Sequence, residues 1–239
     1  MNILAIETSY QRVSVAIYSS NTLAAFYYDD TINMQAENLF PMIERAFIAS
    51  KLGYSDLQHI AVTNGPGSFT GIRIGLSAVK GIMLALPSIS SLVFSNFMVM
   101  GYAAIRQLSD RVKYIAVILQ ATPTEFYVQT LHFDLSPFLE PEMINIEQIA
   151  DYLKRYDAKA AVTGNAIATV LDRIIDNPNL IILPRFAKVD ARRLGSLAGR
   201  WRQFATSMSP DVQPLYIKPA SVNLGGLKIA SMADDCTMP

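Results

Sequence analysis

A run of glycines between two predicted elements carries the clearest chemical signal in the chain. Residues 65–71 read Gly-Pro-Gly-Ser-Phe-Thr-Gly, and they join an apolar strand pattern at 60–63 to a helical pattern over 72–86. Glycine adopts backbone conformations that other residues avoid, and free amides at the start of a helix attract anions. The run therefore predicts a phosphate or carboxylate site, although a tight turn that holds no ligand explains it equally well. The contacts of such a site would be Gly65, Gly67, Ser68 and Thr70.

A second polar turn lies near the start of the chain. Glu7, Thr8 and Ser9 follow an apolar run at 2–6 and precede an alternating run at 12–19. In this position an acid and two hydroxyls would meet a phosphate and its magnesium ion. On spacing alone, an ordinary polar hairpin turn is the simpler interpretation.

Two nucleotide-binding motifs are excluded by the residues that follow the glycines. A Walker loop needs Gly-Lys followed by Ser or Thr, whereas Gly71 is followed by Ile and Arg. A dinucleotide-binding fold needs an acid about twenty residues beyond the glycines. No Asp or Glu occurs between Asp56 and Asp110. The two histidines of the chain are too few and too scattered for a metal site or a histidine-based triad.

A basic cluster surrounds the single tryptophan of the chain, within a helical pattern over 190–204. It comprises Arg192, Arg193, Arg200 and Arg202. Such a cluster is compatible with contacts to an RNA backbone, but a solvated helix face is the simpler interpretation.

The elements that would position these residues follow from the spacing of apolar side chains. Strand patterns lie at 2–6, 12–19, 23–28, 60–63, around 92, 113–119, 126–133 and 160–163. Helical patterns lie at 38–52, 72–86, 96–108, 147–155, 166–175 and 190–204, with Asn38 and Asp190 as N-caps. Strands followed by alternating helices and strands occur twice, which predicts a duplicated α/β fold. We expect an N-terminal lobe at 1–109, a C-terminal lobe at 110–222 and a mobile tail at 223–239.

The composition indicates either a covered surface or a dense core. Hydrophobic residues make up 51% of the chain and charged residues 17%, against roughly 25% charged in an average domain. A large partner interface and a well-packed core explain this equally well. The formal net charge is zero, so the chain has no global positive field for nucleic acid. Any RNA binding must be local or supplied by a partner.

The expected location is the cytoplasm. The single cysteine, Cys236, gives no disulfide framework, and the chain begins with a strand pattern instead of a secretion signal. Residues 81–105 carry no charge and are long enough to span a bilayer. Pro87 and the polar residues around it divide this segment into a helix end, a strand and a new helix, so we predict no membrane span.

These residues resemble the TsaB family, also called YeaZ. The similarity lies in the start at 2–9, in the helix segment 39–43 and above all in the run GPGSFTGIRIG at 65–75. It extends more weakly through 164–165 to 215–217 and so covers nearly the whole chain.

The resemblance implies an actin- and hexokinase-like α/β fold of two lobes, each a mixed sheet with flanking helices. It also implies a non-catalytic subunit that binds and activates the paralogue TsaD, which transfers threonylcarbamoyl to the tRNA adenosine beside the anticodon. The ATPase TsaE would be a further partner, and tRNA would be bound mainly through the complex. No cofactor would be required by the chain alone, and any ATP or ADP would sit at the partner interface.

The residues themselves agree with an inactive subunit. An actin-like ATPase needs a second phosphate turn with an acid and a glycine, and 120–124 contain neither. The sequence departs from the family at Gln120-Ala121-Thr122, where an Asp-Ala-Arg run is usual, and at Gln35, where a histidine is common. Two other functions stay open. An actin-like small-molecule kinase would turn over ATP, and a pure interaction module would not be stabilised by any nucleotide.

The first two long helices supply the predicted partner surface, because both are apolar on more than one face. We expect the chain to dimerise through them when alone and to exchange that contact for TsaD. Burial against their own lobe is the alternative. The residues of this predicted surface are Phe40, Ile43, Phe47, Gly75, Ala78 and Ile82.

Overall fold

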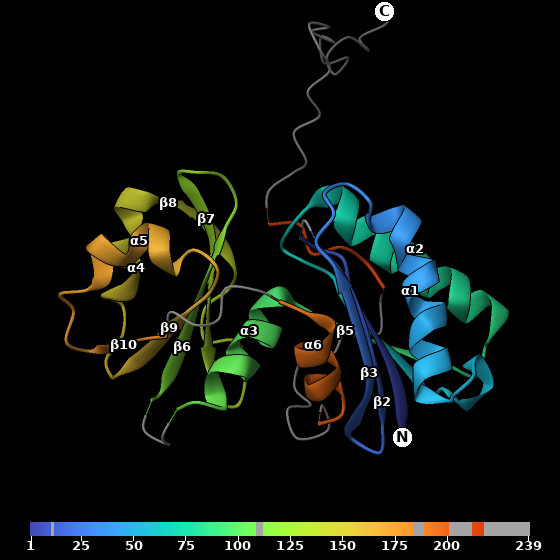
Figure 1. Cartoon of the computed structure of the whole chain (residues 1–239). Helices are drawn as coiled ribbons and strands as arrows, with labels where there is room; N and C mark the ends of the chain where they lie inside the picture. The colour runs from blue at the N-terminus through green and yellow to red at the C-terminus, as the bar shows by residue number, and fades with distance from the viewer. Residues whose placement is uncertain (11, 109–111, 184–188, 201–211, 218–239) are drawn as a thin grey trace, which may run out of the picture.

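The computed structural model describes residues 1–10, 12–108, 112–183, 189–200 and 212–217. Within these ranges the chain forms two five-stranded sheets with helices on both sides of each (Figure 1). The predictions for Trp201, Arg202, Cys236 and the tail at 223–239 concern residues outside these ranges.

The first sheet has the strand order β3-β2-β1-β4-β5. Its strands are β1 Asn2–Glu7, β2 Val13–Ser19, β3 Thr22–Asp29, β4 His59–Thr63 and β5 Ser90–Phe94. β1 pairs antiparallel with β2 and parallel with β4, so it lies at the centre of the sheet. Buried on both faces, it reads as an almost continuous apolar run. Leu4 and Ile6 pack toward the long helices, and Ile3 and Ala5 pack toward the middle of the molecule.

The second sheet repeats the topology of the first. Its order is β10-β9-β6-β7-β8. As in the first sheet, the strand that comes first in the chain, here β6, lies at the centre, with β7 and β8 on one side and β9 and β10 on the other. The strands are β6 Tyr114–Gln120, β7 Glu125–His132, β8 Glu142–Asn145, β9 Ala160–Thr163 and β10 Leu180–Ile182. The short helices α4 Ile149–Leu153 and α5 Ile167–Ile174 cover its outer face. The predicted duplication and the two-lobed α/β fold are therefore confirmed.

The helices α1 Gln35–Ser50 and α2 Phe69–Ala85 cover the outer face of the first sheet. The helix α3 Asn96–Ile105 packs on the second sheet, and α6 Ala191–Ala198 packs on the first. Figure 1 shows α3 and α6 next to each other between the two sheets. The two lobes consequently share one apolar cluster, which includes Ala5, Phe97 and Val117.

This arrangement corrects the predicted division of the chain at 109/110. Residues 189–200 were assigned to the second lobe, but α6 contacts β1 and β2 of the first sheet. Residues 212–217 also return to the first lobe, where Leu215 N donates to Asn64 O at 2.8 Å. The first lobe is therefore built from two separate parts of the sequence, because the chain returns to it after the second sheet is complete.

The start of α1 differs from the prediction as well. The helix begins at Gln35 with Met34 at the N-cap position, so Asn38 is not the cap. Asn38 Nδ2 donates to Asp29 Oδ2 at 2.6 Å, which ties the first turn of the helix to the end of β3. Asp190 does cap α6 as predicted, since its carboxylate accepts from Arg193 N at 3.0 Å. No helix in the described part of the chain is both long and apolar enough to cross a membrane.

Candidate functional site

The glycine run packs directly against the turn between β1 and β2. A Cβ atom at Gly67 would lie 2.3 Å from Ser9 O, and one at Gly71 would lie 2.1 Å from Thr8 O. A Cβ atom at Gly75 would lie 2.5 Å from Thr8 Oγ1. Only glycine permits this approach of the α2 terminus to the turn, because no real Cβ contact is so short. The two polar turns predicted from the sequence therefore meet each other in the structure.

The polar groups of the two turns are used in this contact. Ser68 N donates to Ser9 O at 2.7 Å, and the Ser68 side chain caps α2 by accepting from Gly71 N at 3.2 Å. Thr8 Oγ1 donates to Gly71 O at 2.7 Å. These groups do not fit a phosphate cradle, since a phosphate would need the amides and hydroxyls that here bind the protein itself.

The other two predicted contacts lie apart from this packing. Gly65 has a φ of 116°, and its carbonyl accepts from Asn96 N at 2.7 Å. Thr70 is exposed on the first turn of α2. Of the residues that sequence reasoning offered for a phosphate, Ser68 and Thr70 are exposed to solvent within the described turns.

Glu7 is fully buried at the end of β1. Its Oε1 accepts from Ser9 N at 2.7 Å, from Ser9 Oγ and from Thr63 Oγ1 at 3.3 Å. Burial raises the pKa of Glu7 to about 7. The hydrogen bonds from Ser9 and Thr63 lower this pKa, and the negative charge of Asp190 raises it by a smaller amount. Glu7 Oε2 has no hydrogen-bond partner among the described residues. The carboxyl group thus gains and loses its proton near neutral pH inside the protein.

Asn96 joins this cluster without having been predicted from the sequence. As the first residue of α3, it is completely buried, and its Nδ2 donates at 2.7 Å to both Ser9 Oγ and Pro66 O. It therefore fastens α3 to both polar turns at once. The only sequence signal was a polar residue directly after Ser95, which caps the helix.

In the corresponding turn of the second lobe, between β6 and β7, the backbone amides form hydrogen bonds within that lobe. Ala121 N and Thr122 N both donate to Glu125 O, and Gln120 N donates to Asn165 Oδ1 at 2.8 Å. Across the residues described, no group of three or more His, Cys, Asp or Glu side chains is placed to hold a metal ion.

The outer surface of α1 and α2 carries exposed apolar side chains. Leu84 is 83% exposed and Ile48 is 78% exposed, and Phe40 and Phe69 are also exposed. Between the two helices lies a groove of about 470 Å³. It is lined by Phe40, Tyr54, Gly81, Ile82, Ala85 and Leu86.

The predicted partner residues do not all lie on this surface. Phe40 is exposed beside the groove and Ile82 lines it, although Ile82 is largely buried. Ile43 has no exposed area, and Phe47 and Ala78 are buried in the core of the first lobe. Gly75 is closed off by Thr8. The prediction is wrong for these four because α1 and α2 bury a second stripe against each other as well as one against the sheet.

The fold and the two turns define the class of protein. Each lobe has the same five-stranded mixed sheet, and the chain shares its fold with the ROK hexokinase of Thermus thermophilus, with a TM-score of 0.52 at 10% identity, covering 83% of this chain and 98% of that chain. A family model described as TsaD, tRNA N6-adenosine threonylcarbamoyltransferase, matches residues 32–132.

Comparison with known proteins finds relatives within this class. The chain is 27% identical over 168 residues to the tRNA threonylcarbamoyladenosine biosynthesis protein TsaB of Buchnera aphidicola subsp. Schizaphis graminum, covering 68% of this chain and 78% of that protein. It is 33% identical over 109 residues to the Escherichia coli protein of the same name, an alignment that spans 45% of this chain and 46% of that protein. The structure of YeaZ from Pseudomonas aeruginosa superposes with a TM-score of 0.73 at 24% identity, covering 90% of this chain and 99% of that chain. These relatives and this solved structure are TsaB proteins, also known as YeaZ, and the chain is similar to them over much of its length.

Proposed function

We propose that this chain is the non-catalytic subunit that binds and activates the TsaD paralogue, which transfers threonylcarbamoyl to the tRNA adenosine beside the anticodon. The names of its relatives concern tRNA threonylcarbamoyladenosine biosynthesis, and this supports a role in the same pathway.

The observation that carries the proposal is the apolar outer surface of α1 and α2. A side chain such as Leu84, with 83% of its area exposed, gains free energy when a partner covers it. Together with Ile48, Phe40 and the groove between the helices, it makes an apolar patch of the kind that marks protein interfaces. A similar helix pair on a paralogue would fit such a surface.

The closed polar turns support the non-catalytic part of the proposal. Thr8 Oγ1 donates to Gly71 O, Ser9 Oγ donates to the buried Glu7, and Ser68 N donates to Ser9 O. These hydrogen bonds occupy donors that a bound phosphate would otherwise need. The chemistry is therefore assigned to TsaD.

The remaining parts of the assembly follow from the same assignment. The chain dimerises through the α1–α2 surface when alone and exchanges this contact for TsaD. TsaE is a further partner, tRNA is bound mainly through the complex, and the assembly works in the cytoplasm. The chain needs no cofactor of its own, and any ATP or ADP binds at the interface with the partner.

The proposal is tested by sedimentation velocity of the purified chain, the TsaD paralogue of the same organism, and their mixture. We expect a homodimer for the chain alone and a heterodimer in the mixture. Two species that sediment independently at micromolar concentration would contradict the proposal, since a stable interface of standard size holds together in that range.

A further inference from the structure

The outer face of α2 carries two basic residues and a leucine in one line along the helix. Arg73, Lys80 and Leu84 are separated by seven and four residues, and all three are exposed. At 3.6 residues per turn they lie within about 40° of one another around the helix axis. We call these three residues the basic stripe. No Asp or Glu occurs in the segment 57–109, so the charge of α2 is positive only.

The helix α1 repeats this spacing with the opposite charge. Glu37, Glu44 and Ile48 are also separated by seven and four residues, and all three are exposed. We call them the acidic stripe. Arg45, the one cation of α1, lies about 80° around the helix axis from Glu37, at the flank of the stripe. Ile48 and Leu84 occupy the same place in the two stripes, and they are the most exposed large apolar side chains among the described residues.

The charges of the two stripes are not paired within the described part of the chain. No ion pair between described residues includes Glu37, Glu44, Arg73 or Lys80. Each stripe therefore combines two unpaired charges of one sign with one exposed apolar side chain. A surface of this composition fits a partner of the opposite charge.

Arg73 is already held in position for such a partner. Its guanidinium carbon lies 3.6 Å from the centroid of the Phe69 ring, and its Nε donates to Tyr216 Oη at 3.3 Å. Its two terminal nitrogens donate to no described residue, and they form the fork that fits a carboxylate. A guanidinium that is held in this way loses less conformational entropy when it binds.

We propose that the basic stripe of one copy of this chain binds the acidic stripe of a second copy, with the two helices running in the same direction. Arg73 then meets Glu37 of the second copy, Lys80 meets Glu44, and Leu84 packs on Ile48. A two-fold axis forms each contact twice, because the same surface is used on both copies. Helices running in opposite directions would pair the charges but would leave Leu84 and Ile48 at opposite ends.

The inference rests on the proposed function, because it takes the α1–α2 surface as the contact of the homodimer. It adds the residues that select the partner and fix the register. Exposed ion pairs add little affinity, but like charges brought together oppose a contact strongly. Any protein that replaces the second copy must therefore place acidic groups opposite α2 and basic groups opposite α1.

The test reverses the charges of one stripe at a time and measures self-association by sedimentation velocity. The α2-reversed chain carries Arg73→Glu and Lys80→Glu, and the α1-reversed chain carries Glu37→Lys and Glu44→Lys. Each chain alone brings like charges together, so its self-association should be weaker than that of the wild type by about 100-fold or more. An equimolar mixture, with one chain labelled fluorescently, restores every opposite pair and should form a heterodimer.

Single reversals test the direction of the helices. Arg73→Glu should form a heterodimer with Glu37→Lys and a weaker one with Glu44→Lys. The opposite order, or equal affinities, would overturn the parallel arrangement.

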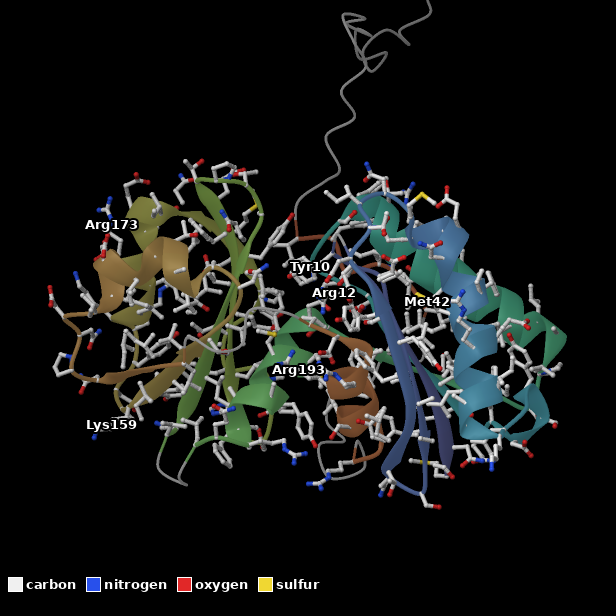
Figure 2. The ribbon with its side chains drawn as sticks, viewed as in Figure 1. Tyr10, Arg12, Met42, Lys159, Arg173 and Arg193 are labelled. Atoms are coloured by element: carbon white, nitrogen blue, oxygen red, sulfur yellow. The ribbon has the colours of Figure 1, made fainter. Side chains whose placement is uncertain are left out.

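The matched control is Lys159→Glu together with Arg173→Glu, which makes the same change of charge in the second lobe. Both residues are exposed, and Figure 2 shows them on the opposite side of the molecule from Met42 of α1. The control should self-associate like the wild type. Urea unfolding checks that every variant is folded, as expected for substitutions at exposed positions.

Three results would overturn the inference. In the first, both reversed chains self-associate like the wild type. In the second, their mixture stays monomeric although both chains are folded. In the third, the control loses as much self-association as the α2-reversed chain.

Sedimentation with the TsaD paralogue separates this inference from the proposed function. If the wild type binds TsaD but the reversed chains do not pair, the stripes are wrong and the subunit role stands. If the reversed chains pair but the wild type does not bind TsaD, the proposed function fails and the stripes stand. A wild-type chain that stays monomeric at micromolar concentration would overturn the pairing of the stripes whatever TsaD does.

Discussion

Gly71 and Thr8 touch so closely that neither tolerates a larger neighbour. Thr8 Oγ1 donates to Gly71 O at 2.7 Å, and a Cβ atom at Gly71 would lie 2.1 Å from Thr8 O. The contact joins two turns that are 63 residues apart in the sequence. It places the start of α2 on the β1–β2 turn.

Gly71→Ala should therefore destabilise the fold. The added methyl group meets backbone, which cannot move aside cheaply, so we expect a loss of about 3 kcal/mol or more in the free energy of unfolding. Gly81→Ala is the matched control, because nothing lies within 4 Å of a Cβ atom at that position of the same helix. It should be neutral or stabilise by up to about 1 kcal/mol through helix propensity. The free energies of unfolding of both variants are measured by urea denaturation. Equal values would contradict the tight packing of Gly71 against Thr8.

Glu7 should make the stability of the protein depend on pH. Its pKa in the folded state is about 7, above the ordinary value of 4.5, so the folded protein holds a proton that the unfolded chain has released. The contribution of Glu7 to the free energy of unfolding is therefore greatest below pH 4.5. It falls by about 3 kcal/mol in total as the pH rises to 7, where the folded protein also loses the proton.

Glu7→Gln has no proton to lose and should show none of this decline. The free energy of unfolding is measured from pH 5 to pH 8 for the wild type and the variant, and the wild type is subtracted from the variant. The difference should rise with pH, while other titrating groups cancel. A flat difference would show that Glu7 is ionised throughout the range.

Leu84→Glu should break the contact with TsaD and leave the lobe folded. A charge at the centre of an apolar interface costs on the order of 2 kcal/mol or more, which weakens binding by about 30-fold or more. Ile175→Glu is the matched control, because Ile175 is an apolar residue of the second lobe with 59% exposure. Ala78→Glu would not serve, since Ala78 is buried in the first lobe. Sedimentation with TsaD should separate the two variants, and equal binding would remove α2 from the interface.

The chain alone should hydrolyse ATP far more slowly than a typical enzyme, whose turnover is roughly one per second or more. The reason is that Ser68 N, Thr8 Oγ1 and Ser9 Oγ already donate within the protein. A phosphate-release assay checks the rate, and the melting temperature with and without MgATP checks binding. Turnover in the enzymatic range together with a raised melting temperature would favour a small-molecule kinase instead.

Local patterns were sufficient to predict most of the elements. The strand at 160–163 was predicted with its observed ends, and the β1–β2 hairpin was placed to within a residue. Alternation along a strand and spacing along a helix are properties of neighbouring residues, so the sequence carries them directly. The strands β8 and β10, which are short and have partly exposed side chains, gave no such signal.

Contacts between residues far apart in the sequence could not be predicted from these local patterns. The glycines at 67 and 71 were predicted to form either an anion site or a tight turn without a ligand, but the sequence did not indicate that they pack against the β1–β2 turn. The two apolar stripes of α2 were recognised, yet periodicity does not say that α1 covers one of them and leaves Leu84 outside. The return of α6 to the first sheet likewise has no local signature, because it depends on how the second lobe is closed.

The most direct test of the account is the formation of threonylcarbamoyladenosine in tRNA from purified components. TsaD, TsaE, tRNA and threonylcarbamoyl-adenylate are combined with no addition, with the wild-type chain or with Leu84→Glu, and the modified nucleoside is measured by mass spectrometry. We predict that the wild-type chain raises the rate ten-fold or more, equivalent to about 1.4 kcal/mol or more in the barrier. Leu84→Glu should not raise it, and the chain without TsaD should form no product. An equal rate with and without the chain, or product formed by the chain alone, would contradict its role as the activating, non-catalytic subunit.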